Sequence, residues 1–166
     1  RKDGRELQHA SFRLRSDFKV VLTAVTAHMP RYAAWRRINL LDIPLQYADA
    51  QLRNNKDIVL AAVRNTGYSL KYASDALQGN EDIVFSAIDA SDGSVLRYAS
   101  PSMRENKRVV LTALEKKGDN LQHSSAACQD DRNLVLVAVS RSWSALRFAS
   151  SRLRDDKQVV LTAIGK

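Results

Sequence analysis

The sequence is poor in several residue types, and each shortage excludes a class of protein or site. Its single cysteine, Cys128, cannot form an internal disulfide, and one thiol cannot build a cysteine-based zinc cage. With three prolines and six glycines in 166 residues, the composition is not that of a collagen or a low-complexity chain. No apolar run reaches the roughly 20 residues that a transmembrane helix needs, so we expect no membrane span.

Positive charge is in excess, but its distribution is uneven. The formal net charge is +8. Residues 1–44 contain nine basic and four acidic residues, residues 45–95 four and seven, and residues 96–166 thirteen and seven. An acidic middle segment does not suit a uniform polyanion-binding rod. The basic composition is compatible with an intracellular, organellar protein but does not indicate a compartment.

An internal repeat accounts for the whole chain. The segment LQYADAQLRNNKDIVLAAV, which starts at Leu45, has one earlier and four later counterparts. The six leading leucines are Leu7, Leu45, Leu70, Leu96, Leu121 and Leu146, and they are separated by 38, 25, 26, 25 and 25 residues. We therefore predict a single helical-repeat domain over residues 1–166, with one insertion at about residues 26–44.

The second half of each repeat has the pattern of a capped helix. Ten residues after each leading leucine stand Asp17, Asn55, Asn80, Asn106, Asp131 and Asp156. Asp or Asn before an apolar run is an N-cap signature, because the side chain accepts early backbone N–H groups. Seven residues later, alanine occurs in every copy, which indicates a close approach to a neighbouring helix. Gly67, Gly93 and Gly118 follow these runs and are expected to form left-handed C-caps.

The first half of each repeat predicts a shorter helix. Leu45, Ala48 and Leu52 lie on one face of a helix. Four residues after each leading leucine come the capping residues Ser11, Asp49, Ser74, Ser100, Ser125 and Ser150. Because one such unit cannot bury its apolar face alone, the units must stack. The fold class is therefore predicted as an all-α solenoid of six roughly 25-residue helix-turn-helix units.

The repeat pattern L-x-Y-A-S-x-x-L-R-x-D-x-x-V-V-L-x-A-V resembles a tandem helical repeat family that is catalogued as a domain of unknown function. The resemblance covers nearly the whole chain except about residues 26–44. It implies an α-helical repeat and transfers no catalytic or binding residue.

Two places carry candidate partner-binding residues. The insertion contains Tyr32, Trp35, Arg36 and Arg37, whose residue types are enriched at interface hot spots. The alternative is an additional helix that packs Trp35 onto the stack. Trp143, which replaces a glycine three residues before Leu146, is a second candidate.

Two columns of basic residues are candidates for phosphate contact. One column contains Arg15, Arg53, Gln78, Arg104, Gln129 and Arg154, and the other contains Phe18, Lys56, Glu81, Lys107, Arg132 and Lys157. Stripes of this kind could track a nucleic-acid backbone. The alternative is a solvated face that pairs with neighbouring acids. The candidate phosphate-contacting residues are Arg104, Lys107, Arg108, Arg154 and Lys157.

The remaining candidates favour structural roles. The aromatic column His9, Tyr47, Tyr72, Tyr98, His123 and Phe148 could stack bases. Its repetition at every period favours a structural layer in the core. Cys128 could be a nucleophile with His123 as its base, but it occupies a column of leucines and methionine and is expected to act as a small hydrophobe. We predict no catalytic, cofactor-binding or metal site.

The sequence therefore favours a non-enzymatic helical-repeat scaffold that binds other protein subunits, as an accessory subunit or segment of a larger assembly. The alternative is an RNA-binding solenoid of a ribonucleoprotein that uses a basic edge with little sequence specificity.

Overall fold

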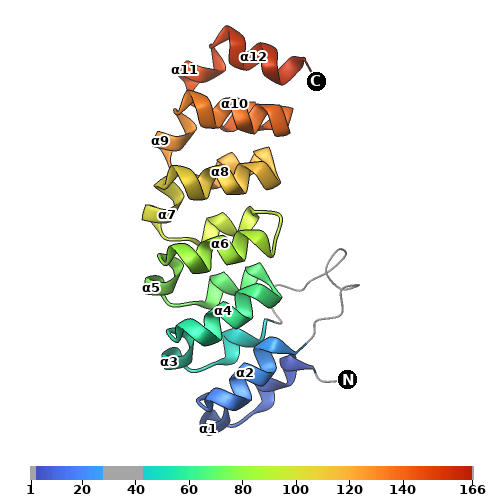
Figure 1. The fold of residues 1–166 in the computed structure, drawn as a ribbon, viewed down its shortest axis with the longest axis vertical. Helices are drawn as coiled ribbons and strands as arrows, with labels where there is room; N and C mark the ends of the chain where they lie inside the picture. Colours follow the sequence, from blue (N-terminus) through green and yellow to red (C-terminus); the bar gives the residue numbers. More distant parts are fainter. Residues whose placement is uncertain (1–2, 28–42, 166) are drawn as a thin grey trace. The chain divides into compact units, whose positions relative to one another are not determined.

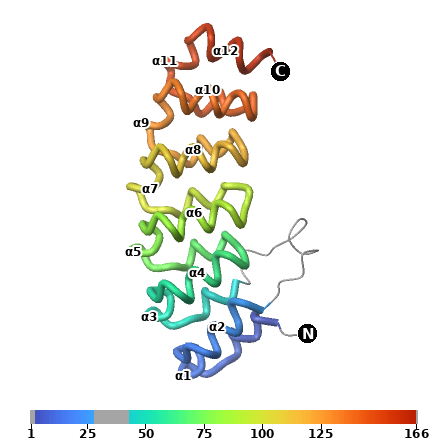
Figure 2. The backbone as a smooth tube through the Cα atoms, in the orientation of Figure 1, coloured from blue at the N-terminus to red at the C-terminus, as the bar shows by residue number. Residues whose placement is uncertain are grey.

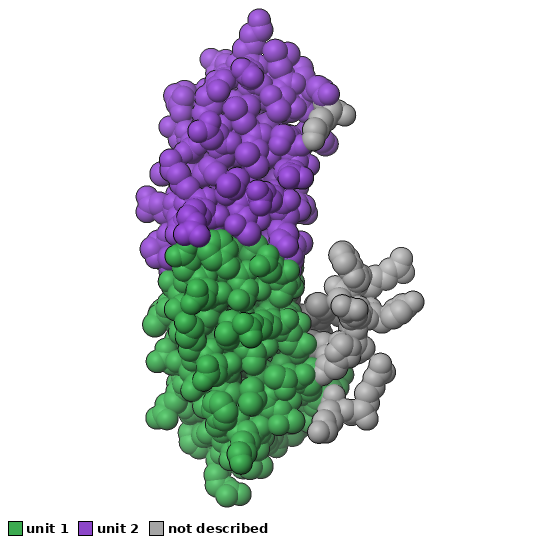
Figure 3. Space-filling view, viewed as in Figure 1, with its two compact units in different colours: residues 1–90 green, residues 91–166 purple. Residues whose placement is uncertain are grey.

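A computed structural model describes residues 3–27 and 43–165, and every regular element in these ranges is a helix. The chain divides into two compact units, residues 1–90 and 91–166, which Figure 3 colours separately. Each unit contains three of the six repeats. The predicted all-α repeat fold is confirmed.

Each repeat consists of a 3₁₀ helix, a short α-helix and a longer α-helix (Figure 1). The elements of the first unit are η1 (Gly4–His9), α1 (Phe12–Arg15), α2 (Phe18–Thr26), η3 (Pro44–Tyr47), α3 (Ala50–Arg53), α4 (Lys56–Asn65), η4 (Gly67–Tyr72), α5 (Asp75–Gln78) and α6 (Glu81–Asp89). Those of the second unit are η5 (Ser94–Tyr98), α7 (Pro101–Glu105), α8 (Lys107–Lys116), η6 (Gly118–His123), α9 (Ala126–Gln129), α10 (Arg132–Arg141), η7 (Trp143–Phe148), α11 (Ser151–Arg154) and α12 (Lys157–Ile164).

The predicted N-caps of the longer helices are all present. The side chain of Asn55 accepts hydrogen bonds from the N–H groups of Asp57 and Ile58, at 3.0 and 3.1 Å. The same role is filled by Asp17, Asn80, Asn106, Asp131 and Asp156. Because these side chains satisfy donors that have no partner within the helix, they determine where each longer helix begins.

The prediction that three glycines form left-handed C-caps of the longer helices is wrong, because α6 has Ala90 as its C-cap and Gly93 is the N-cap of η5. Only Gly93, with φ of 83°, has a positive φ among the described residues. Gly67 and Gly118 instead begin the 3₁₀ helices η4 and η6, after an extended residue has ended the preceding α-helix. A Cβ atom on Gly118 would lie 2.1 Å from the carbonyl oxygen of Ala138. Glycine is needed there for close backbone approach.

Within each unit, like elements of successive repeats pack on one another (Figure 2). In the first unit α4 contacts both α2 and α6, and in the second unit α10 contacts both α8 and α12. The 3₁₀ helices form a second layer against these longer helices. The core between the layers includes the leading leucines and the alanine column, and Leu70, Leu121, Ala87 and Ala138 are fully buried.

A backbone hydrogen bond joins the short helices of neighbouring repeats. The N–H of Ser74 donates to the carbonyl of Arg53 at 3.0 Å, and the N–H of Ser150 donates to that of Gln129 at 3.0 Å. Equivalent bonds run from Asp49 to Arg15 and from Ser125 to Arg104. Each bond uses a carbonyl near the end of a short helix, which has no partner within that helix. Stacking therefore satisfies the backbone as well as burying apolar surface.

Within the described ranges, no helix has both the length and the apolar character that crossing a membrane requires.

Candidate functional site

The first basic column braces the repeats from within. The Arg15 Nε donates to the carbonyl of Ala10 at 2.8 Å, and the Gln78 Nε2 donates to that of Ala73 at 3.1 Å. Gln129 makes the same bond to Ser124 at 3.2 Å. In each case the acceptor follows the C-terminal end of a 3₁₀ helix, where carbonyls lack helical partners. In these three repeats, the side chain thus holds the short α-helix against the 3₁₀ helix before it.

Arg104 stands in the same column of the sequence. Its side chain is half-buried, and its Nε is shielded from solvent without a hydrogen-bond partner, as is the Nε of Arg53. Arg154, in the last repeat, is exposed. Of these residues, Arg154 has the exposure that phosphate contact requires, and its role there stays a prediction.

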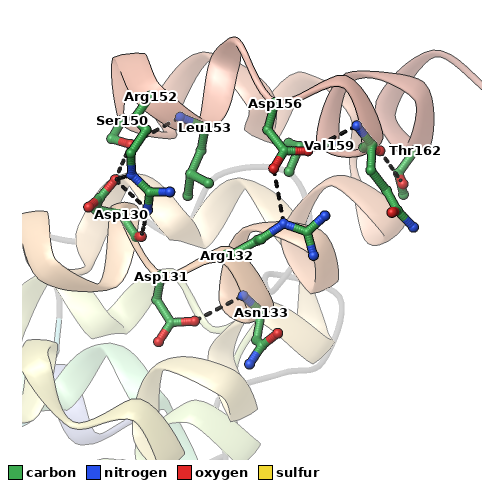
Figure 4. Close-up of polar contacts among 11 residues, drawn as sticks. Asp130, Asp131, Arg132, Asn133, Ser150, Arg152, Leu153, Asp156, Val159 and Thr162 are labelled. Atoms are coloured by element: carbon green, nitrogen blue, oxygen red, sulfur yellow. Dashed lines mark hydrogen bonds and ion pairs between the residues drawn. The ribbon is translucent and has the colours of Figure 1, made fainter.

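The second basic column forms ion pairs with the next repeat. Lys56 lies 3.0 Å from Asp82, and Lys107 lies 2.6 Å from Asp131. Arg132 lies 3.0 Å from Asp156, as Figure 4 shows. These ion pairs agree with the alternative interpretation of the column, in which its basic residues form a solvated face and pair with neighbouring acids. Phosphate contact by Lys107, Arg108 and Lys157 stays a prediction, and Lys107 would have to leave Asp131 to make it.

The ion pairs shift the pKa values of their carboxylates. The hydrogen bond from Lys107 lowers the pKa of Asp131, and the hydrogen bond from Arg132 lowers the pKa of Asp156. The hydrogen bond with Asp131 correspondingly raises the pKa of Lys107. Since Lys107 and Arg132 are exposed, each pair contributes little to stability. These ion pairs therefore neutralise surface charge more than they stabilise the fold.

The aromatic column is not in the core, contrary to expectation. Its members are half-buried, except His9, which is exposed. Three of the rings have the cation of the preceding residue near their faces: Lys71 lies 5.2 Å from the Tyr72 ring, Arg97 5.4 Å from Tyr98, and Arg147 4.6 Å from Phe148. These positions suit long side chains whose apolar stems cover a ring. A base that stacked on these ring faces would have to displace the cations.

His123 is half-buried, and its pKa is shifted. Burial lowers the pKa of His123, and the positive charge of Arg97 lowers it further. Arg104 acts in the same direction, while Asp92 opposes them.

This shift makes stability depend on pH. Between the ordinary histidine pKa of about 6.5 and the lower pKa of folded His123, the unfolded chain binds the proton more readily. Stability is therefore full above about pH 6.5 and falls as the pH decreases through that window. We expect a His123→Phe variant, which has the residue found at Phe148, to lose this part of the dependence. In thermal melts at pH 7.5 and pH 5.0, the decrease in Tm on acidification should be larger for the unaltered protein than for the variant. The difference should be a few degrees at most, because His123 is half-exposed. An equal Tm change in both proteins would contradict the assignment.

Cys128 is a structural residue, as the sequence predicted. Its side chain is 1% exposed, and its thiol donates to the carbonyl of Glu105 at 3.4 Å. A buried thiol bonded to backbone is not presented to a substrate. The described residues include no group of three or more His, Cys, Asp or Glu side chains that could hold a metal ion.

The candidate partner-binding residues fall into two groups. Trp143 is 70% exposed at the start of η7, as expected of a residue available for contact. Tyr32, Trp35, Arg36 and Arg37 lie outside the described residues, so their role stays a prediction.

The structure identifies one surface that the sequence reasoning missed. In every repeat the third apolar residue of the longer helix is half-buried or exposed, and we call this set, three residues in each unit, the outer apolar column: Leu22, Leu60, Phe85, Leu111, Leu136 and Leu161. Leu111 is 36% exposed although it belongs to an interior repeat, and the others are half-buried or exposed. The sequence pattern that could have identified these residues is the triplet of successive apolar residues in each repeat. Residues on a helix are about 100° apart, so a triplet such as Val109, Val110 and Leu111 cannot face the core completely.

Comparison with known proteins gives a family. The family model for a domain of unknown function (DUF4116) matches the chain in three tandem segments, residues 43–78, 80–126 and 131–166. The matched segments cover more than half of the chain, and the chain belongs to this family. The chain matches no curated protein and no solved structure.

Proposed function

Because the chain belongs to the DUF4116 family of helical repeats, whose description assigns no activity, we propose its function from the arrangement of its side chains. We propose a non-enzymatic scaffold that binds other protein subunits within a larger assembly.

The outer apolar column is the observation that supports this proposal. In α8, Leu111 stands between the polar positions Arg108, Thr112 and Glu115, and all the described repeats keep an apolar residue at its position. A row of apolar side chains with a polar border is the composition of a protein interface core and its rim. Solenoids characteristically use such extended faces for binding. Trp143 adds an exposed aromatic side chain of the kind that anchors interfaces.

RNA binding is the second candidate, and the net charge of +8 favours it. Arg108, Arg154 and Lys157 are exposed and could approach phosphates. Against it, the Lys107–Asp131 and Arg132–Asp156 pairs neutralise much of the column that a phosphate backbone would follow. We therefore place protein binding first.

The two functions are separated by native co-purification with and without nuclease, using two variants of the same helix. Leu111→Asp puts a charge into the outer apolar column, and Arg108→Ala removes an exposed cation one turn away. If the chain binds proteins, partners survive nuclease, are lost from Leu111→Asp by roughly tenfold or more, and are kept by Arg108→Ala. Circular dichroism checks that both variants remain folded.

The opposite pattern would establish RNA binding instead. The associated material would then be removed by nuclease, and its affinity would fall steeply with salt. Arg108→Ala would lower the slope of that salt dependence by about one, and Leu111→Asp would leave it unchanged.

A further inference from the structure

In the second unit the outer apolar column is turned away from the neighbouring helices by the register of each longer helix. Leu136 shows this most directly, because α10 packs against both α8 and α12 and the side chain is still only half-buried. Leu134 and Val135, which precede it, are buried. The equivalent leucines on α8 and α12, Leu111 and Leu161, are 36% and 52% exposed.

The three leucines of this unit form a row with a regular spacing. They stand at equivalent positions of helices that pack side by side (Figure 2), and packed helices lie about 8–10 Å apart. Residues seven apart on an α-helix are about 10.5 Å apart and lie on the same face. A helix laid across α8, α10 and α12 could therefore place one apolar side chain on each leucine.

An extended segment would fit the spacing but not the surface. Three residues of a strand also cover about 10 Å. The backbone of such a segment would lie on helices whose own N–H and C=O groups are already used, and its polar groups would lose water without gaining partners. A helix satisfies its own backbone groups, so it is the occupant that this row of leucines favours.

The charges beside the row differ between the two units. In the second unit, the N-caps and first two residues of the longer helices include four basic and two acidic side chains: Lys107, Arg108, Arg132 and Lys157, with Asp131 and Asp156. All four cations are exposed, whereas both carboxylates are half-buried. The same positions of the first unit include two basic and four acidic side chains: Lys19 and Lys56, with Asp17, Asp57, Glu81 and Asp82. This border is thus positive in the second unit and negative in the first.

We propose that the outer apolar column of the second unit binds an acidic amphipathic helix of a partner protein, with apolar residues seven apart on the leucines and carboxylates beside the first turns of α8, α10 and α12. The inference rests on the proposed scaffold function and names the class of partner segment. Binding of an amphipathic helix by its apolar face is a recurring mode of recognition. Asp57, Glu81 and Asp82 would repel the same helix from the first unit.

The ligand side is tested with peptides of about 21 residues, three heptads long, whose binding to the full chain is followed by fluorescence anisotropy. The first peptide has leucine every seven residues and glutamate along one border. The second has lysine in place of each glutamate, and the third has the composition of the first with its leucines five residues apart, which takes them off one face. A cross-link on the far face keeps all three helical, as circular dichroism verifies. We expect the first peptide to bind at least tenfold more tightly than either of the others.

The protein side is tested with matched variants of the two units. Leu111→Asp should weaken binding of the first peptide at least tenfold, and Leu60→Asp, at the equivalent position of α4, should leave it unchanged. Arg108→Ala removes one border charge and should weaken binding about threefold or less, which agrees with the retention of protein partners expected above. Circular dichroism verifies the fold of each variant, and the comparison of the three peptides does not depend on any variant.

Four results would overturn the proposal: no binding of the acidic helical peptide, equal or tighter binding of its lysine form, equal binding of the peptide with leucines five apart, or an equal loss in folded Leu60→Asp and Leu111→Asp. The proposed scaffold function would survive any of them if protein partners still resist nuclease and are lost from Leu111→Asp. Removal of all associated material by nuclease would instead contradict the scaffold function itself.

Discussion

Gly118→Ala should destabilise the protein by about 3 kcal/mol, which lowers Tm by about 6–12 °C for a chain of this size. The added Cβ would lie 2.1 Å from the Ala138 carbonyl oxygen and 2.9 Å from the Ser142 nitrogen. Both are backbone atoms, and Ser142 donates to that same carbonyl at 2.8 Å, so the last turn of α10 would have to move.

Chemical denaturation followed by circular dichroism measures this effect, with Gly165→Ala as the control. The nearest atom to a Cβ on Gly165 is the Leu161 carbonyl oxygen at 3.0 Å, at an exposed helix end where the chain has room to adjust. We expect a change within about 0.5 kcal/mol for the control. Similar small changes in both variants would show that η6 does not depend on close backbone approach.

Leu121→Ala should also cost about 3 kcal/mol. Leu121 is fully buried, and the leading leucine occupies the layer between the 3₁₀ helices and the longer helices. Truncating a buried leucine removes its transfer free energy and leaves a cavity that the surroundings fill only partly. In a stack of repeats, each repeat is stabilised by its neighbours, so the loss of stability should extend beyond the fifth repeat.

Leu111→Ala provides the matched control for Leu121→Ala. The same atoms are removed, but Leu111 is 36% exposed on the outer apolar column. We expect about 1 kcal/mol or less. Equal free energies of unfolding for the two variants would mean that the outer apolar column belongs to the core. The m-value of each transition shows whether the stack still unfolds as one unit.

The sequence was sufficient to predict the fold because the signals are local and occur six times. Asn55 accepts from residues two and three positions away, so its capping role is visible in a short segment. The leading leucines and the alanine column are likewise positions in a helical period. The predicted family resemblance followed from the same pattern and is confirmed by the family match.

Predictions about the surface were less successful, since they depend on where a side chain points. Arg15 and Gln129 stand in a column that is basic in four repeats, which suggested a stripe open to phosphates. In the structure both side chains turn back to carbonyls five residues earlier. Likewise, the triplets of apolar residues indicated helix without showing that the third residue, such as Leu111, faces outward.

The sequence by itself determined the repeat, its period and the start of each longer helix, because these depend on contacts within a few residues. Only the tertiary structure decided the partners of Lys107 and Asp130, which lie 24 and 20 or 22 residues away in the next repeat. It also decided that Gly118 faces a backbone carbonyl, whereas Gly93 adopts a positive φ. Both outcomes depend on how closely one stacked helix approaches another, and that distance is set by packing across the layers rather than by local preference.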